Sequence, residues 1–476
     1  MADYKFLLET RLSQDQQLTL QMIERLRLAA AGARRAAGLN LYLTGGSMRD
    51  LVAGQPVRSL EITTEGDPVA LAGALGQAGA ERLDTLATPR GVRFMYRGVR
   101  VRMAAARTAA GPATIMEALR HRGLTLNSIG LSLNAGSRGL PLDPTNGIGD
   151  IEARLVRMND AYVFYEDPIV LLRAVRLQVR LEFTLEERTA ARMATAQEGN
   201  YLERAAPEAR GLELAAIAYQ PGIATLLRAL EAGHWLEPAF GKGVQCSKMQ
   251  LPALARLPEV VEAWQQLGLT IDPGLPALAL MLGQLAPADQ NRLTRWLPDQ
   301  RLREWKKLST TARSFEALWL KAASSASGDW LRRSQAVIEK VEPEAVVFAS
   351  LRPQNAKAGK RLAEFQTAAQ QARSRIPLGV LRGLGLAPRS LRAEEIVRPL
   401  YRRLLGGEGL SDAEITADLR AAVMEPTRPP AAAAPARAAR APRAAVAAPA
   451  KSRRPASTSR SSTAATASAA TRKGKK

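Results

Sequence analysis

A Gly-Gly-Ser turn follows directly after the apolar run LYLT, and an arginine and an aspartate come shortly after it. Glycine has no Cβ atom, so the backbone N–H groups of such a turn can approach phosphate oxygens closely. A nearby arginine can add a bidentate contact to the same phosphate. The pattern predicts a nucleotide-binding turn, and its candidate residues are Gly45, Gly46, Ser47, Arg49 and Asp50.

A second strand-like run, SLEIT, carries Ser59 and Glu61 two residues apart. Side chains so spaced share one face of a strand, where two carboxylates can hold a pair of metal ions for nucleotidyl transfer. Here a serine hydroxyl, a poor and uncharged magnesium ligand, takes one place. Glu65 lies roughly 13 Å from Glu61 along an extended strand, too far to replace the missing acid. Glu61 is therefore the only candidate catalytic or metal-binding carboxylate of this run.

A small α/β unit is needed to position these residues. Strand-like runs are expected within 40–145 as LYLT, SLEIT, VRFMY and VRVRM, and the last two are separated by a hairpin turn at Arg97-Gly98. PVALAGALGQAGA, which lies between SLEIT and VRFMY, has the pattern of a helix. Helical patterns prevail after about residue 150, where no further strand is expected.

The predicted fold class is α+β, with a small mixed-sheet head followed by all-α domains. We expect an N-terminal helix in 1–36, the head over 37–150, a helical neck over 151–215, a helical body over 216–330, a helical tail domain over 331–426 and a basic extension over 427–476. The extension is rich in Ala, Pro, Ser, Thr, Arg and Lys, so it cannot bury enough apolar area to fold and is expected to be disordered.

YLTGGSMRDLVAGQPVRSLEIT resembles the head motif of the class II tRNA nucleotidyltransferase and bacterial poly(A) polymerase family. LTLNSIGLSLNAGSRGLPLDPTNGIGDIEARLVR and YEDPIVLLRAVRLQVRLEFTLEERT are similar to a later head segment and to the neck-helix motif of that family. The ordered matches run, with gaps, from about residue 40 to 420. The resemblance implies metal-dependent addition of nucleotides to an RNA 3′ hydroxyl, in a head with helical domains curved around the RNA end. Matching residues of the later segment are Asn127, Asp143, Pro144, Gly147 and Asp150.

The resemblance also marks where the metal-binding pattern is broken. The family's third acid corresponds to Arg102, a cation that repels a metal ion. Glu61 and Arg102 either form an ion pair where metals would lie or are two solvated strand residues. No cofactor is therefore expected, although an active enzyme would need Mg²⁺ or Mn²⁺ on Glu61, helped by Asp67 or by substrate phosphates.

The motifs that the resemblance assigns to nucleotide recognition are altered too. His121-Arg122-Gly123 stands where the family has Arg-Arg-Asp, and Val170 replaces the neck arginine that would contact the base. A valine offers no hydrogen bond to the edge of a base. Arg173 and Arg176, further along the neck helix, either contact a nucleotide or pair with acidic groups of the fold. Remaining candidate nucleotide-binding residues are Asn127, Glu166, Asp167 and Arg173.

The chain of 476 residues carries a net charge of +22, which favours a nucleic-acid partner. Residues 427–476 hold twelve Lys or Arg and no acidic residue, so this extension is either a nonspecific nucleic-acid contact or a solubilising segment. The single Cys246 excludes a disulfide framework, and two histidines exclude a histidine-rich metal cluster. No signal peptide or membrane span is recognised, and a cytoplasmic location is expected.

Taken together, the residues predict an RNA-binding, catalytically inactive homologue of a tRNA nucleotidyltransferase or poly(A) polymerase, with tRNA-like 3′ ends as the expected partner. An active RNA 3′-terminal nucleotidyltransferase is the first alternative. A scaffolding protein whose basic extension coats DNA is the second. The sequence does not indicate an oligomeric state.

Overall fold

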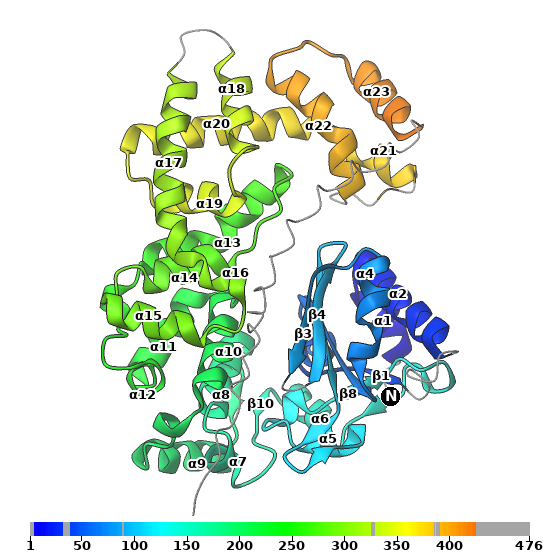
Figure 1. Ribbon diagram of the computed structural model, residues 1–476, viewed down its shortest axis with the longest axis vertical. Helices are drawn as coiled ribbons and strands as arrows, with labels where there is room; N and C mark the ends of the chain where they lie inside the picture. Colours follow the sequence, from blue (N-terminus) through cyan, green and yellow to red (C-terminus); the bar gives the residue numbers. More distant parts are fainter. Residues whose placement is uncertain are drawn as a thin grey trace, which may run out of the picture. The chain divides into compact units, whose positions relative to one another are not determined.

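The head contains a seven-stranded mixed sheet with the strand order β3-β4-β5-β2-β1-β8-β9 (Figure 1). Only β2 and β5 run parallel, and the other neighbouring pairs are antiparallel. The strands are β1 (Asn40–Thr44), β2 (Ser59–Glu65), β3 (Glu81–Ala87), β4 (Arg90–Tyr96), β5 (Val99–Ala105), β8 (Gly130–Ser132) and β9 (Pro141–Leu142). The expected α+β class, a mixed-sheet head with a mostly helical remainder, is confirmed.

The computed structural model describes residues 4–31, 39–87, 90–324, 329–384, 386 and 391–424. Residues 1–425 group into one compact unit. The basic extension predicted over 427–476 lies outside the described residues. None of the helices within the described ranges combines the length and the apolar character that a membrane crossing requires.

The four strands expected from the sequence are all present. The turn at Arg97 and Gly98 joins β4 to β5, and both residues have positive φ angles, 51° and 76°. Such a pair of angles suits the right-handed twist of a two-residue hairpin, which explains the glycine. Strands β3, β8 and β9 of this sheet were not predicted, because ERLDTLA is polar and GLS and PL are short.

The alternation along β5 determines which side chains reach solvent. Val99, Val101 and Met103 are buried, whereas Arg100 and Arg102 lie on the opposite face of the strand. Helices α1 (Tyr4–Arg11), α2 (Gln14–Ala31) and α4 (Ala72–Gln77) cover one face of the sheet (Figure 1). A helix was expected over 14–36, and residues 32–38 of that range lie outside the described part of the chain.

Short elements complete the head and lead into the neck. They are α3 (Gly45–Val52), η1 (Pro68–Leu71), β6 (Arg107–Thr108), β7 (Gly111–Pro112), α5 (Ile115–Arg120), η2 (Thr125–Asn127), η3 (Ala135–Ser137), α6 (Gly147–Glu152), β10 (Leu155–Val156), α7 (Val163–Glu166), α8 (Val170–Leu181) and β11 (Thr184–Leu185). The expectation of no strand beyond residue 150 was wrong in one detail. Strands β10 and β11 form a two-residue parallel pair, too short to produce a sequence pattern.

Helices account for the remainder, with two further 3-10 turns. The bounds are α9 (Glu187–Glu198), η4 (Tyr201–Arg204), α10 (Pro207–Ala218), α11 (Ile223–Ala232), α12 (Leu236–Phe240), η5 (Cys246–Lys248), α13 (Leu251–Gln266), α14 (Gly274–Leu282), α15 (Pro287–Trp296), α16 (Gln300–Arg303), α17 (Trp305–Ala323), α18 (Trp330–Ile338), α19 (Pro343–Leu351), α20 (Ala356–Ser374), α21 (Leu378–Gly383), α22 (Leu391–Leu405) and α23 (Asp412–Met424).

An aromatic cluster packs several of these helices together. The Phe365 ring on α20 lies 6.3 Å from the Trp264 ring on α13 and 5.2 Å from the Trp319 ring on α17, measured between centroids. All three side chains are fully buried. Aromatic pairs at these distances stabilise a fold by more than the burial of their apolar surface alone. The boundary proposed at residue 330 therefore crosses a shared core.

A buried carboxylate links the head to the neck. Asp50 on α3 accepts hydrogen bonds from the Arg49 Nε at 2.9 Å and from the Arg180 Nη2 at 2.5 Å. Arg180 belongs to α8, 130 residues further along the chain. The three side chains are at most 10% exposed. One acid is thus the shared counter-ion of two buried guanidinium groups from two parts of the fold.

Replacing Asp50 by alanine is expected to destabilise the fold by roughly 3–5 kcal/mol, because two buried cations lose their counter-charge. Chemical denaturation of the full chain measures this loss. The matched control is Asp84→Ala, which removes the exposed partner of Arg93 and is expected to cost about 0–1 kcal/mol. Equal losses in the two variants would contradict a special role for Asp50.

Candidate functional site

A cleft of about 1260 Å³ lies between the open face of the head sheet and the neck helices. Twelve arginines line it, against six aspartates and glutamates. The head supplies β1, α3, β2 and β5, and the helical part supplies α8 and α10. An excess of guanidinium groups at the walls makes the cleft attractive to anions.

The glycine turn lies at the floor of this cleft, but a protein carboxylate already approaches it closely. Gly45 has a φ of 61°, a conformation that favours glycine. A Cβ built on Gly45 would lie 2.3 Å from the Glu61 Oε2, and one on Gly46 would lie 2.9 Å from the Glu61 Oε1. The turn was predicted to admit phosphate oxygens, and in this structure it accommodates the Glu61 side chain.

Ser47 and Ser59 hold α3 against β2. The Ser47 Oγ donates to the Ser59 backbone oxygen at 2.9 Å and accepts from the Glu61 backbone N–H at 2.6 Å. Ser59 and Glu61 do share one face of β2, as their spacing predicts, and both line the cleft. The hydroxyl of Ser47, a predicted nucleotide contact, is therefore already engaged by backbone groups.

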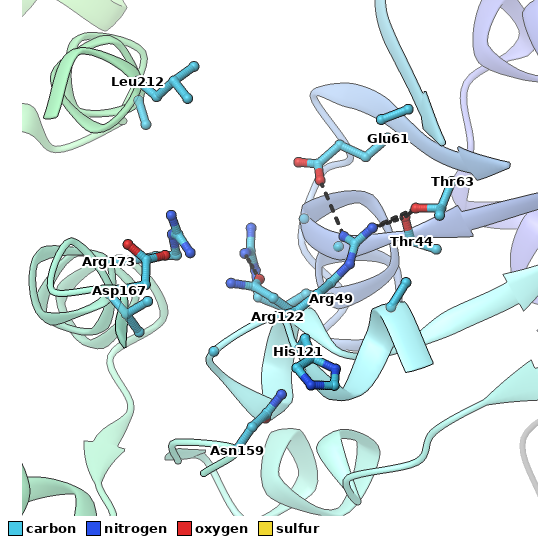
Figure 2. Close-up of a pocket in the computed structure, with 18 of the residues that line it drawn as sticks. Thr44, Arg49, Glu61, Thr63, His121, Arg122, Asn159, Asp167, Arg173 and Leu212 are labelled. Atoms are coloured by element: carbon cyan, nitrogen blue, oxygen red, sulfur yellow. Dashed lines mark hydrogen bonds and ion pairs between the residues drawn. The ribbon is translucent and has the colours of Figure 1, made fainter. Parts of the chain in front are cut away.

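Arg122 is the cation nearest to Glu61 (Figure 2). Its Nη1 lies 4.0 Å from the Glu61 Oε2, and its Nη2 donates to the Thr63 Oγ1 at 2.5 Å and the Thr44 Oγ1 at 3.1 Å. Burial lowers the pKa of Arg122, and the Glu61 carboxylate opposes that shift. The two hydroxyls hold the guanidinium in place beside the glycine turn.

Of the two alternatives left open for Glu61 and Arg102, the ion pair between them is not formed. The two residues are register partners on the parallel strands β2 and β5. Among the described residues, however, Glu61 has its ion-pair contact with Arg122, and Arg102 has no carboxylate within ion-pair distance. Parallel strands place register partners side by side, but side-chain direction decides which groups meet.

The residues at this position do not fit a two-metal centre. Such a centre needs several anionic oxygens converging on each ion. Within the described residues no group of three or more His, Cys, Asp or Glu converges in that way. Asp67, the possible additional ligand, instead accepts a hydrogen bond from the Val69 N–H and pairs with the Arg90 Nη2 at 2.6 Å. Glu61 is thus left with cations rather than with further acids.

Several residues that match the family motifs stabilise the head. Arg49 donates to Asp50 and, through its Nη1, to the Asn127 Oδ1 at 2.7 Å. The Asp150 Oδ2 accepts from the Thr125 Oγ1 at 2.7 Å, and Asp143 accepts from the backbone N–H groups at the start of α6. These bonds connect α3, η2 and α6. Arg49 and Asn127, predicted nucleotide contacts, therefore already have protein partners.

The neck wall presents a second set of charges. Arg176 donates to the buried Glu213 on α10, with 2.5 Å between Nε and Oε1, and the Arg173 Nε lies 3.8 Å from the same carboxylate. This favours the role of acid partner that the sequence left open for both arginines. Partial withdrawal from water raises the pKa of Asp167, which keeps some solvent contact, and Arg173 opposes the shift. Asp167 and Arg173 lie across the cleft from Arg122 (Figure 2).

Two of the altered motif positions touch each other. Gly123 has a φ of 83°, and a Cβ built on it would lie 3.0 Å from the Val170 Cγ2. Val170 is buried, with 1% of its surface exposed. A larger side chain at either place would need the other to move. The head and the neck therefore meet at a close apolar contact where the family resemblance places polar groups.

Sequence reasoning missed Arg58, Arg100 and Glu213. Arg100 could have been found, because it has the same parity as Arg102 in VRVRM. Arg58 directly precedes β2, outside any recognised motif. Glu213 lies 37 residues from Arg176 in sequence, so only the packing of α8 on α10 reveals their contact.

Comparison with known proteins identifies the head. Residues 41–157 match the family model described as the poly A polymerase head domain. The chain is 28% identical over 254 residues to an A-adding tRNA nucleotidyltransferase of Halalkalibacterium halodurans, covering 50% of this chain and 58% of the relative. It is 24% identical over 280 residues to an A-adding tRNA nucleotidyltransferase of Aquifex aeolicus, covering 56% and 33%.

These matches cover less than two thirds of each relative's own length. Among solved structures, one titled tRNA-processing enzyme (apo form I) aligns with 83% of this chain and 99% of its own, at 20% identity and a TM-score of 0.46. The head match and the relatives confirm the resemblance seen in the sequence motifs. Residues 41–157 thus form a head domain of the poly A polymerase family, and the chain is similar to A-adding tRNA nucleotidyltransferases over about half of its length.

Proposed function

We propose that this chain is an RNA-binding member of its family that does not catalyse nucleotidyl transfer, and that it binds tRNA-like 3′ ends in the arginine-lined cleft. The observation that carries the proposal is the arrangement around Glu61. Its carboxylate lies against the Gly45-Gly46 turn with Arg122 beside it, and Arg102 is its register partner. The Arg122 guanidinium thus lies beside the one carboxylate that a metal ion would need, and a cationic residue stands where a further acid would be required.

The walls of the cleft support an RNA ligand. Their excess of arginines suits a phosphate backbone, which dominates the affinity of most nucleic-acid complexes. Tyr162 lines the cleft with 69% of its surface exposed, and Tyr165 nearby is 60% exposed. Exposed aromatic faces beside arginines are the usual platform for stacking unpaired bases.

Base selection is expected to be weak. Val170 provides no hydrogen bond and is buried against Gly123. Arg173 and Arg176 on the same helix are held by Glu213. A ligand would therefore be recognised by its backbone and its shape more than by the identity of its last base.

An active enzyme is the second candidate. Glu61 keeps a carboxylate at the glycine turn, and two of the similar proteins are named A-adding tRNA nucleotidyltransferase. Activity would require Arg122 to move away and one Mg²⁺ or Mn²⁺ ion to bind Glu61 with oxygens of the substrate. The loss of the base-reading arginine would then favour loose addition over an ordered product.

Incorporation of labelled CTP and ATP into tRNA lacking its 3′ end tests these two candidates directly. The wild type is expected to show no incorporation with magnesium or manganese, because its site holds one carboxylate among cations. The double variant Ser59→Asp/Arg102→Glu restores the acidic pattern and shows whether the fold still supports transfer. Signal from the wild type, measured beside a tRNA-binding assay, would refute the inactive assignment.

The basic extension is expected to strengthen RNA binding through phosphates alone. For single strands, the logarithm of the affinity falls with the logarithm of the salt concentration by roughly 0.7 per phosphate neutralised. Deleting residues 427–476, with their twelve Lys or Arg, should therefore flatten this dependence. An extension of the same length with alanine at those twelve positions controls for chain length. An unchanged slope in both variants would place the extension out of contact with RNA.

A further inference from the structure

The arginines of the cleft differ in their partners. Five of them pair with buried carboxylates: Arg49, Arg157, Arg173, Arg176 and Arg180. Within the described ranges, five others have no Asp or Glu within ion-pair distance: Arg58, Arg100, Arg102, Arg107 and Arg120. Of this second group, Arg100 and Arg102 lie on β5 and Arg58 directly precedes β2.

The strand register brings these three arginines to one wall. Arg100 and Arg102 are two residues apart on β5, so their side chains share the face that borders the cleft. On β2, Ser59 is the register partner of Arg100. Arg58 directly precedes Ser59 in the sequence. Arg58 and Arg100 are close enough to affect each other electrostatically, and all three residues line the cleft.

The same corner contains polar groups of the helical part. The Arg100 guanidinium carbon lies 4.1 Å from the centroid of the Tyr219 ring. Gln220, the next residue, lines the cleft with only 6% of its surface exposed, and its buried Nε2 has no hydrogen-bond partner. Buried amide donors without a partner are uncommon and costly, which points to a missing acceptor.

The charges that act on Arg58 are mostly positive. Partial withdrawal from water lowers the pKa of Arg58 to about 10; the neighbouring Arg180, Arg49 and Arg100 add to the shift, and Asp50 opposes it. Arg58 remains charged at neutral pH. An anion bound among these arginines would relieve their mutual repulsion, as counter-ions do in other arginine clusters.

We propose that Arg58, Arg100 and Arg102 form a metal-independent binding site for a dianionic phosphate group, carried by an RNA 3′ end or by a free nucleotide. The proposal rests on the function proposed above, because it specifies which group of the ligand enters the cleft. Guanidinium groups replace the metal ions as the partners of phosphate oxygens. Gln220 supplies a neutral hydrogen-bond donor at the same corner.

A terminal phosphate suits the site better than a backbone phosphodiester. A phosphomonoester carries about 1.5 to 2 negative charges at neutral pH, whereas each backbone diester carries one. Three guanidinium groups without acidic partners at one corner favour the more concentrated charge. A phosphate at the RNA 3′ end also occupies the hydroxyl that a nucleotidyl acceptor would need, in agreement with a binding rather than a catalytic role.

The test compares one short single-stranded RNA bearing either a 3′ phosphate or a 3′ hydroxyl, with ATP as a third ligand, each in EDTA and in magnesium. The full-length chain is used. Arg102→Gln removes one member of the cluster, and its side chain has no ion-pair partner in the described structure, so folding should be preserved. Arg256→Gln, an exposed position on α13 outside the cleft, is the control with the same change of charge.

The 3′-phosphorylated RNA is expected to bind roughly ten- to a hundredfold more tightly than the hydroxyl form in EDTA. Arg102→Gln should lose most of that preference and Arg256→Gln should keep it. ATP that binds in EDTA and displaces the phosphorylated RNA would assign the same site to nucleotide phosphates.

Equal affinity for the two RNAs, or a preference that appears only with magnesium, would overturn the phosphate site while leaving the proposed RNA binding intact. Binding of ATP in EDTA without binding of either RNA would support the phosphate site and contradict the proposed RNA binding. A preference lost equally in Arg102→Gln and Arg256→Gln would also overturn the site, because a general change of charge would then explain it.

Discussion

Asp50 accepts hydrogen bonds from Arg49 in the head and from Arg180 in the neck, and this buried carboxylate sets the position of one cleft wall relative to the other. Buried guanidinium groups are tolerated only with a counter-charge, so the two parts of the fold are constrained to meet here. Arg49 also donates a hydrogen bond to Asn127, so the same group of contacts includes η2 of the head. The geometry of the cleft follows from that contact.

The electrostatic character of the cleft follows from how the acids are distributed. Asp50 and Glu213 are buried and engaged by arginines on the neck helix, so they contribute little negative field to the open space. Glu61 is the acid at the glycine turn, and Arg122 lies beside it. A cleft of this kind attracts phosphate and repels metal ions. The proposed phosphate site follows from this distribution, because guanidinium groups line the space beside Glu61.

The altered motif positions are linked in space rather than scattered. Gly123 and Val170, 47 positions apart in sequence, form one close apolar contact. Ser59, Glu61 and Arg102 lie on the two adjacent parallel strands. Because close packing couples neighbouring side chains, a change at one of these positions alters what its neighbour can be. Each group of altered positions therefore acts as a unit.

Local pattern and ordered motifs determined the α+β class, the hairpin at Arg97-Gly98, the shared face of Ser59 and Glu61, and the family itself, because these depend on spacing along the chain. Strand β3 and the short strands β6 to β11 were missed, since short or polar strands depend on their neighbours for stability. Side-chain partners were decided only by the tertiary structure. Glu61 meets Arg122 rather than Arg102, and Arg49 meets Asp50 and Asn127 rather than open solvent. The physical reason is that ion pairs and burial arise from contacts between distant segments, and spacing along one strand or helix does not specify which charges those segments bring together.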